Sequence, residues 1–201
     1  GHQCGESETI IGRWLTATGK RDEVLIATKV GMEMGDGSKG LRKDYILKSV
    51  EDSLRRLQTD HIDLYQSHAD APETPIEETL SAFDTLVSQG KVRVIGASNF
   101  SPERLEQSLN TSAELGTPSY ASLQPEYNLY DRADFEAIME RVCLERRVGV
   151  ITYYSLASGF LSGKYRSEAD FGKSQRGGGI AKYLTPRGFR ILEALDEVAA
   201  A

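Results

Sequence analysis

Five short apolar runs, rich in β-branched residues, recur along the chain. Each is largely apolar rather than strictly alternating, which is typical of parallel strands covered on both faces. We therefore predict strands over residues 24–30, 62–68, 92–98, 122–128 and 148–154.

The stretches between these runs carry apolar residues at helical spacing, on the stripes 10–15, 46–57, 76–87, 105–109, 135–142 and 189–195. Thr74, Ser101 and Thr185 each precede a proline, the order expected of an N-cap followed by the first helical residue. Glu77 would complete a capping box with Thr74. Gly90 supplies a stop signal after the third stripe.

Five strands interleaved with six helices favour βαβ units and a parallel sheet. No GxGxxG follows any strand, which argues against a dinucleotide-binding Rossmann fold. The strands recur at the pace of a (β/α)8 TIM barrel, which normally needs about 250 residues. We therefore predict an α/β fold, an incomplete (β/α)8 TIM barrel, with residues 1–201 as one domain. The N-terminal strands and helix, and the last strand and helix, are expected to be missing.

Composition narrows the class of partner. The chain has 201 residues, 24 basic and 30 acidic, and a formal charge of −6, which argues against nucleic acid and against a polybasic membrane patch. Its two cysteines, Cys4 and Cys143, lie far apart and show no metal-ligand spacing, which favours a reduced, cytoplasmic protein without a metal site. No run approaches the length of a membrane span.

Polar residues gather where the predicted strands end. Lys29, His68 and Ser98 close the first three strands, and Gln124 and Tyr153 lie in the last two. In a barrel the carboxyl ends of all strands open onto one face, so these side chains would share a pocket. Taken singly, each is more often structural: a lysine that extends to solvent, a hydrogen-bonded histidine, or a helix cap.

Five segments, taken together, resemble the aldo-keto reductase family. They are "LIATKVG", "IDLYQSHAD", "GKVRVIGASNFSPERL", "LQPEYNLYDR" and "ITYYSLASGFLSGKY", and they occur in the family's order over nearly the whole chain. The likeness is to the branch that includes bacterial aldo-keto reductases and potassium-channel β subunits. The resemblance implies that NADP(H) is the cofactor and that NADPH transfers a hydride to an aldehyde or ketone. A tyrosine would give the carbonyl oxygen its proton.

The resemblance also implies roles for individual residues. Lys29 matches the lysine that favours ionisation of that tyrosine, and His68 matches the histidine that donates to the carbonyl oxygen. The remaining matches are to cofactor contacts: Ser98, Asn99 and Gln124 to the nicotinamide carboxamide, Tyr153 to the nicotinamide ring, Ser155, Leu156, Ser158 and Gly159 to the pyrophosphate, and Lys164 and Arg176 to phosphates. The "RGGG" at 176–179 lacks the spacing of a P-loop and is expected to be a flexible segment.

The chain departs from the family at both ends. The family's catalytic aspartate and tyrosine precede the stretch that here reads "CGESET", and the segment that binds the 2′-phosphate follows the last residues given. Tyr45, Tyr65, Tyr127 and Tyr154 stand in the wrong motifs to replace the missing acid. We therefore expect the isolated chain to be inactive, and the choice between NADPH and NADH is not readable.

Two other functions stay open. Lys29 could serve as the Schiff-base amine of an aldolase or lyase on the same barrel. The fold could instead be a cofactor-binding regulatory subunit, as in the potassium-channel β subunits. The physiological carbonyl substrate, and whether the protein forms a homo-oligomer, are not readable from the sequence.

Overall fold

A computed structural model describes residues 5–35 and 37–201 of the protein. Cys4, on which part of the cytoplasmic prediction rests, lies outside these residues. The described chain forms two compact units: unit 1 comprises residues 5–124 and 142–150, and unit 2 comprises residues 125–141 and 151–201.

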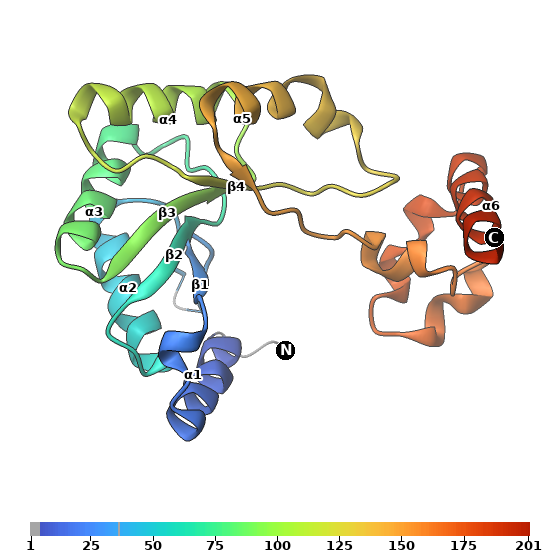
Figure 1. The fold of residues 1–201 in the computed structure, drawn as a ribbon, viewed down its shortest axis with the longest axis horizontal. Helices are drawn as coiled ribbons and strands as arrows, with labels where there is room; N and C mark the ends of the chain where they lie inside the picture. Colours follow the sequence, from blue (N-terminus) through green and yellow to red (C-terminus); the bar gives the residue numbers. More distant parts are fainter. Residues whose placement is uncertain (1–4, 36) are drawn as a thin grey trace. The chain divides into compact units, whose positions relative to one another are not determined.

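Unit 1 is built on a parallel sheet whose strands follow one another in chain order, β1-β2-β3-β4-β5 (Figure 1). The strands are β1 (Ala27–Val30), β2 (Ile62–Ser67), β3 (Val92–Ser98), β4 (Ser122–Gln124) and β5 (Gly149–Val150). Sequential parallel strands joined through helices are the arrangement found in (β/α)8 barrels, so the predicted α/β class and partial barrel are confirmed. β3 has the predicted bounds, and the other four strands are shorter than predicted. β4 ends at Gln124 because Pro125 has no N–H to donate to the ladder.

Six α-helices occur in the described residues: α1 (Glu6–Thr18), α2 (Lys43–Leu57), α3 (Ile76–Ser88), α4 (Pro102–Leu115), α5 (Glu140–Arg146) and α6 (Pro186–Ala200). The stripe predicted for α2 is buried, from Ile46 to Leu57. α1 forms as predicted but buries only Gly12 and Leu15, whereas Ile10 and Trp14 are exposed. The predicted helix over 135–142 begins with a π-helical turn at Phe135–Met139 before α5.

The sheet presents different residues to its two faces. Tyr65 of β2 packs edge-to-face on Phe83 of α3, with ring centroids 6.0 Å apart, so it points toward the helices. Its neighbour Gln66 points the other way, because successive strand residues alternate. Gln66 is in register with Lys29 and with Gly96. Lys29 therefore belongs to the sheet face opposite α3.

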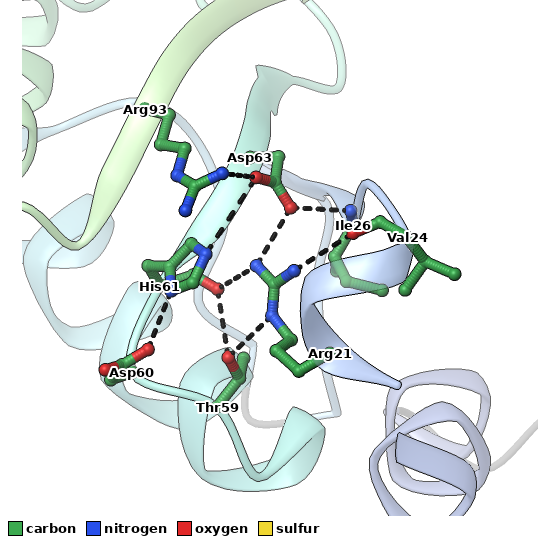
Figure 2. Close-up of polar contacts among 8 residues, drawn as sticks. All are labelled: Arg21, Val24, Ile26, Thr59, Asp60, His61, Asp63 and Arg93. Carbon is green, nitrogen blue, oxygen red and sulfur yellow. Dashed lines mark hydrogen bonds and ion pairs between the residues drawn. The ribbon is translucent and has the colours of Figure 1, made fainter. Parts of the chain in front are cut away.

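The start of β2 is held by a buried carboxylate (Figure 2). Asp63, only 6% exposed, accepts hydrogen bonds from Arg21 (2.8 Å) and from the Ile26 amide (2.9 Å) through Oδ2, and from Arg93 (2.8 Å) through Oδ1. Arg21 also donates to the carbonyl of His61 and to Thr59. The Asp63 carboxylate thus links the turn before β1 to the first residues of β2 and β3.

Two of the three predicted N-caps are confirmed. The Ser101 hydroxyl accepts from the Arg104 amide, and the Thr185 hydroxyl accepts from the Gly188 amide. The prediction for Thr74 is wrong, because α3 begins one residue later, with Pro75 as its N-cap residue. The Thr74 hydroxyl is buried and has no hydrogen-bond partner among the described residues.

This difference predicts opposite results for two substitutions in unit 1. Ser101→Ala should lower the free energy of unfolding by about 1 kcal/mol, because the Arg104 amide loses its acceptor. Thr74→Val should leave it unchanged or raise it by up to about 1 kcal/mol, because a methyl group replaces an unsatisfied buried hydroxyl. Urea unfolding followed by the fluorescence of Trp14, the only tryptophan, measures both. A loss of stability in Thr74→Val equal to that in Ser101→Ala would contradict the assignment.

Unit 2 has its own core. Its buried residues are Ala157, Phe160, Tyr165, Ile180, Tyr183 and Leu192. The rings of Phe160 and Tyr183 stack at 5.3 Å with 17° between their planes. The "RGGG" segment forms a short 3-10 turn at Gly177–Gly179, in which a Cβ on Gly177 would lie 1.8 Å from the Phe171 carbonyl oxygen. Glycine is therefore required at this packed position.

Candidate active site

Lys29 and His68 line the same pocket of unit 1. Lys29 lies in β1, His68 directly follows β2, and the His68 amide donates to the Val30 carbonyl (2.8 Å). The pocket has a volume of about 600 Å³. The convergence of these two side chains follows from neighbouring parallel strands that end at the same edge of the sheet.

The electrostatics of the two groups are linked. Partial burial lowers the pKa of Lys29. Burial and then the positive charge of Lys29 lower the pKa of His68. Within residues 5–35 and 37–201 no carboxylate forms an ion pair with Lys29. The pocket therefore favours a neutral imidazole beside a poorly compensated ammonium group.

This coupling is testable by following the His68 ring through a pH titration by NMR. The pKa of His68 should lie below the ordinary value of about 6.5, so that the ring gains its proton only at lower pH. Lys29→Met should raise that pKa toward the ordinary value, because it removes the neighbouring charge while leaving the burial. Lys20→Met, at an exposed lysine paired with Glu23, serves as the control and should leave the titration unchanged. An identical His68 titration in both variants would contradict the coupling.

Sequence reasoning missed a second polar cluster in this pocket. Glu8 of α1 accepts hydrogen bonds from Thr28 (2.5 Å), next to Lys29, and from Arg56 of α2 (2.6 Å). Glu8 stands in the first turn of α1, where acidic residues are ordinary, so the local pattern carried no signal. The cluster joins two helices to the strand that carries Lys29.

Tyr45 also lines this pocket, and its hydroxyl donates to the Met32 carbonyl (3.0 Å). Tyr45 stands next to Ile46, the first residue of the buried stripe of α2. Its place in the sequence therefore predicts a core residue and gives no sign that it lines a pocket. Two other tyrosines of unit 1, Tyr65 and Tyr120, have buried hydroxyls whose pKa is raised, mainly by burial.

Ser98, Asn99 and Gln124 are connected in unit 1. The Ser98 hydroxyl donates to the Gln124 carbonyl (2.7 Å), and the Asn99 side-chain amide donates to Ser98 Oγ (3.1 Å) and to the His68 carbonyl (2.9 Å). Asn99 has a φ of 54°, a left-handed conformation that asparagine tolerates better than most residues. Gln124 Oε1 is buried without a hydrogen-bond partner among the described residues. That orphaned acceptor fits an amide N–H₂ group from a ligand.

The other predicted cofactor residues lie in unit 2. Tyr153 is partly buried and meets Tyr154 edge-to-face at 5.2 Å. A second pocket, of about 440 Å³, is lined by Ser155, Leu156, Ser158, Gly159, Lys164 and Arg176, together with Tyr154 and Ser174. Unit 2 thus brings six of the seven predicted residues of this stretch to one concave surface.

The turn at residues 157–159 shapes this second pocket. Ala157, Ser158 and Gly159 all have left-handed φ angles, of 48°, 56° and 97°. A Cβ on Gly159 would lie 3.2 Å from Lys164 Nζ, so glycine leaves room for the ammonium group beside the turn. An amine and a guanidinium around a polar turn suit phosphate oxygens.

The described part of the chain offers neither a metal centre nor a membrane span. No group of three or more histidine, cysteine, aspartate or glutamate side chains in it is placed to hold a metal ion. None of its helices combines the length and the apolar character needed to cross a membrane.

Comparison with known proteins gives a consistent result. The family profile described as "Aldo/keto reductase family" matches residues 3–201. The chain is 36% identical over 196 residues to aldo-keto reductase YhdN of Bacillus subtilis, an alignment that covers 96% of this chain and 57% of the relative.

Two other relatives show similar coverage. Aldo-keto reductase yakc [NADP(+)] of Schizosaccharomyces pombe is 32% identical, over 96% of this chain and 57% of the relative. L-glyceraldehyde 3-phosphate reductase of Escherichia coli is 35% identical, over 97% of this chain and 59% of the relative. The chain therefore spans somewhat more than half the length of the curated relatives it matches.

Proposed function

Since this chain belongs to the aldo/keto reductase family, we propose that it provides the lysine, histidine and cofactor-binding part of an oxidoreductase that reduces an aldehyde or ketone with NADPH. The observation that carries this proposal is the shared pocket of Lys29 and His68 in unit 1. The name of the Schizosaccharomyces pombe relative, which includes NADP(+), supports the choice of cofactor.

We assign the cofactor contacts to residues whose chemistry fits. Gln124 Oε1 would accept from the carboxamide, and Ser98 and Asn99 would support it. Tyr153 would offer a flat aromatic surface to the ring. Lys164 and Arg176 would pair with phosphate oxygens, and Ser155, Leu156, Ser158 and Gly159 would line their path. When bound, the reduced nicotinamide supplies the hydride.

The chain's own side chains act on the carbonyl group. A neutral His68 can donate its ring N–H to the carbonyl oxygen, where it would orient the substrate and stabilise the negative charge that develops. The ammonium group of Lys29 would favour the ionised form of a phenol placed beside it. Reduction also requires a proton donor for the carbonyl oxygen, and none of the tyrosines characterised in unit 1 is free to act as one. The Tyr45 hydroxyl donates to the Met32 carbonyl, and those of Tyr65 and Tyr120 are buried.

We therefore propose that these 201 residues alone bind NADPH but do not reduce aldehydes. Binding is measured by quenching of NADPH fluorescence. Lys164→Met combined with Arg176→Met should weaken it at least about tenfold at low salt, because charge-assisted phosphate contacts are lost. Arg190→Met, at an exposed arginine outside the pocket, is the control and should leave binding unchanged.

Equal binding by the double variant and the control would contradict the phosphate assignment. Consumption of NADPH with an aromatic aldehyde by the unaltered chain, absent from Lys29→Met, would contradict the proposed inactivity.

One observation favours a second candidate, a Schiff-base aldolase or lyase. Lys29 has a pKa lowered by burial and no ion-pair partner in the described residues, as a nucleophilic amine requires. Its amine would add to a substrate carbonyl and release water to form an imine. Borohydride reduction followed by mass spectrometry should then find the substrate attached to Lys29, and an unmodified Lys29 would exclude this candidate.

A further inference from the structure

The loop that follows β1 places two methionines at the pocket of Lys29 and His68. Met32 is 49% exposed and Met34 is 41% exposed, and both line this pocket. Exposed methionines beside a polar site are unusual enough to need a reason, since large apolar side chains gain by burial. Their thioether side chains are flexible and adapt to ligands of varied shape.

The backbone of this loop is held in place. The Gly40 amide donates to the Gly31 carbonyl (2.8 Å), which closes the loop at its base. Gly31 and Gly40 have φ angles of 119° and 97°, which only glycine adopts without strain. The Tyr45 hydroxyl donates to the Met32 carbonyl (3.0 Å). The methionine side chains therefore project from an anchored backbone.

The charges that line the pocket balance one another. Three carboxylates (Glu6, Glu8, Asp52) face three cations (Lys29, Lys48, Arg56). Glu8 and Arg56 form an ion pair at 2.6 Å. Asp52 pairs with Arg55, whose exposed side chain does not line the pocket. The side chains that line the pocket therefore carry no net formal charge, so they do not form the cluster of cations that would attract an anionic substrate.

From the apolar loop and the balanced charges we propose that Met32 and Met34 form the wall that selects uncharged carbonyl compounds with an aryl or alkyl group over phosphorylated aldehydes. The carbonyl group would lie toward Lys29 and His68, and the apolar group would contact the two thioethers. This inference rests on the proposed function, because it assigns the substrate class of the same site.

Methyl NMR of the 201-residue chain tests the proposal without turnover. The chain has three methionines, and the third, Met139, is buried in unit 2 and serves as an internal control. With ¹³C-methyl methionine, acetophenone should shift the signals of Met32 and Met34 and leave that of Met139 in place. Glyceraldehyde 3-phosphate at the same concentration should shift none of them.

Two double variants distinguish the effect of apolar contact from that of side-chain size. Met32→Gln with Met34→Gln keeps the side-chain length but adds polar atoms, and should weaken acetophenone binding about tenfold, read from the His68 ring signals. Met32→Leu with Met34→Leu should bind within about twofold of the unaltered chain, because leucine preserves the apolar volume. Both pairs change exposed side chains and leave the core intact.

Equal acetophenone binding by the glutamine and leucine pairs would overturn the proposal, as would tighter binding of glyceraldehyde 3-phosphate than of acetophenone or a shift confined to Met139. The proposed reductase function fails separately, through the NADPH binding experiment, because acetophenone binding requires no cofactor.

Discussion

Asp63→Asn should lower the free energy of unfolding of unit 1 by several kcal/mol, a large effect for the exchange of one charged side chain. The carboxylate is 6% exposed and bridges Arg21, Arg93 and the Ile26 amide (Figure 2). Breaking a buried ion pair by removing one partner costs about 3–5 kcal/mol. We expect about 2–4 kcal/mol for Asp63, because Arg93 is 58% exposed and can return to solvent.

The loss should depend on pH in a defined direction. Burial alone would raise the pKa of Asp63, but the Ile26 amide and the two arginines outweigh it and hold the pKa below its ordinary value. A carboxyl whose pKa is lower in the folded state stabilises that state at pH values above its unfolded pKa of about 3.9. The difference in the free energy of unfolding between the unaltered chain and Asp63→Asn should therefore be largest near neutrality and shrink as the pH falls below about 4.

Urea unfolding at several pH values, followed by Trp14 fluorescence, measures this difference. Asp22→Asn is the matched control, an exposed aspartate in the adjacent turn, and should change stability by less than about 0.5 kcal/mol. A difference between the unaltered chain and Asp63→Asn that is the same at pH 3 as at pH 7 would show that the carboxylate charge is not responsible.

Gly12→Ala should also destabilise unit 1, although alanine is the better helix former. α1 crosses α2 so closely that a Cβ on Gly12 would lie 2.2 Å from the Arg56 carbonyl oxygen and 2.8 Å from the Leu57 carbonyl carbon. These are backbone atoms of a helix and cannot yield as a side chain would. Overpacking at the upper end of about 1–3 kcal/mol, less a gain of about 1 kcal/mol in helix propensity, leaves a net loss of about 2 kcal/mol.

The test is calorimetry together with Trp14 fluorescence, since Trp14 lies in the displaced helix. Gly172→Ala is the control, because no atom lies within 4 Å of its added Cβ and its φ is not left-handed. If Gly12→Ala were as stable as the control, the close crossing of α1 and α2 would be wrong. Gly12→Val should be worse than Gly12→Ala, because it adds two further methyl groups at the contact.

Local sequence signals predicted the strands of unit 1 and the starts of two helices, one in each unit. The hydrophobic runs located all five strands, and Ser101 and Thr185 cap the helices that they precede. Thr74 shows the limit of such signals. A threonine before a proline matches the same pattern, but the chain begins α3 one residue later and buries the threonine hydroxyl. Thr74 is 2% exposed and its carbonyl accepts a hydrogen bond from Arg104, 30 residues away, a contact that the local pattern does not reveal.

The candidate site was predictable only in part, for a related reason. Lys29 and His68 could be placed because each lies at or next to the carboxyl end of a strand, and neighbouring parallel strands end at the same edge of the sheet. Glu8 and Arg56 are 48 residues apart and belong to different helices, so no spacing rule links them. The salt bridge between them depends on the close crossing at Gly12, which is a property of packing rather than of either helix alone.

The order of the strands has a consequence for how unit 1 can fold during synthesis. From β2 onward, each strand pairs with the strand made immediately before it, so its partner has already left the ribosome when it emerges. Among the five described strands, none pairs with a strand from which it is separated by another strand in the sequence, as happens when a sheet grows in both directions from a central strand. The sheet can therefore gain one strand at a time as translation proceeds, and the most recently made strand forms its edge.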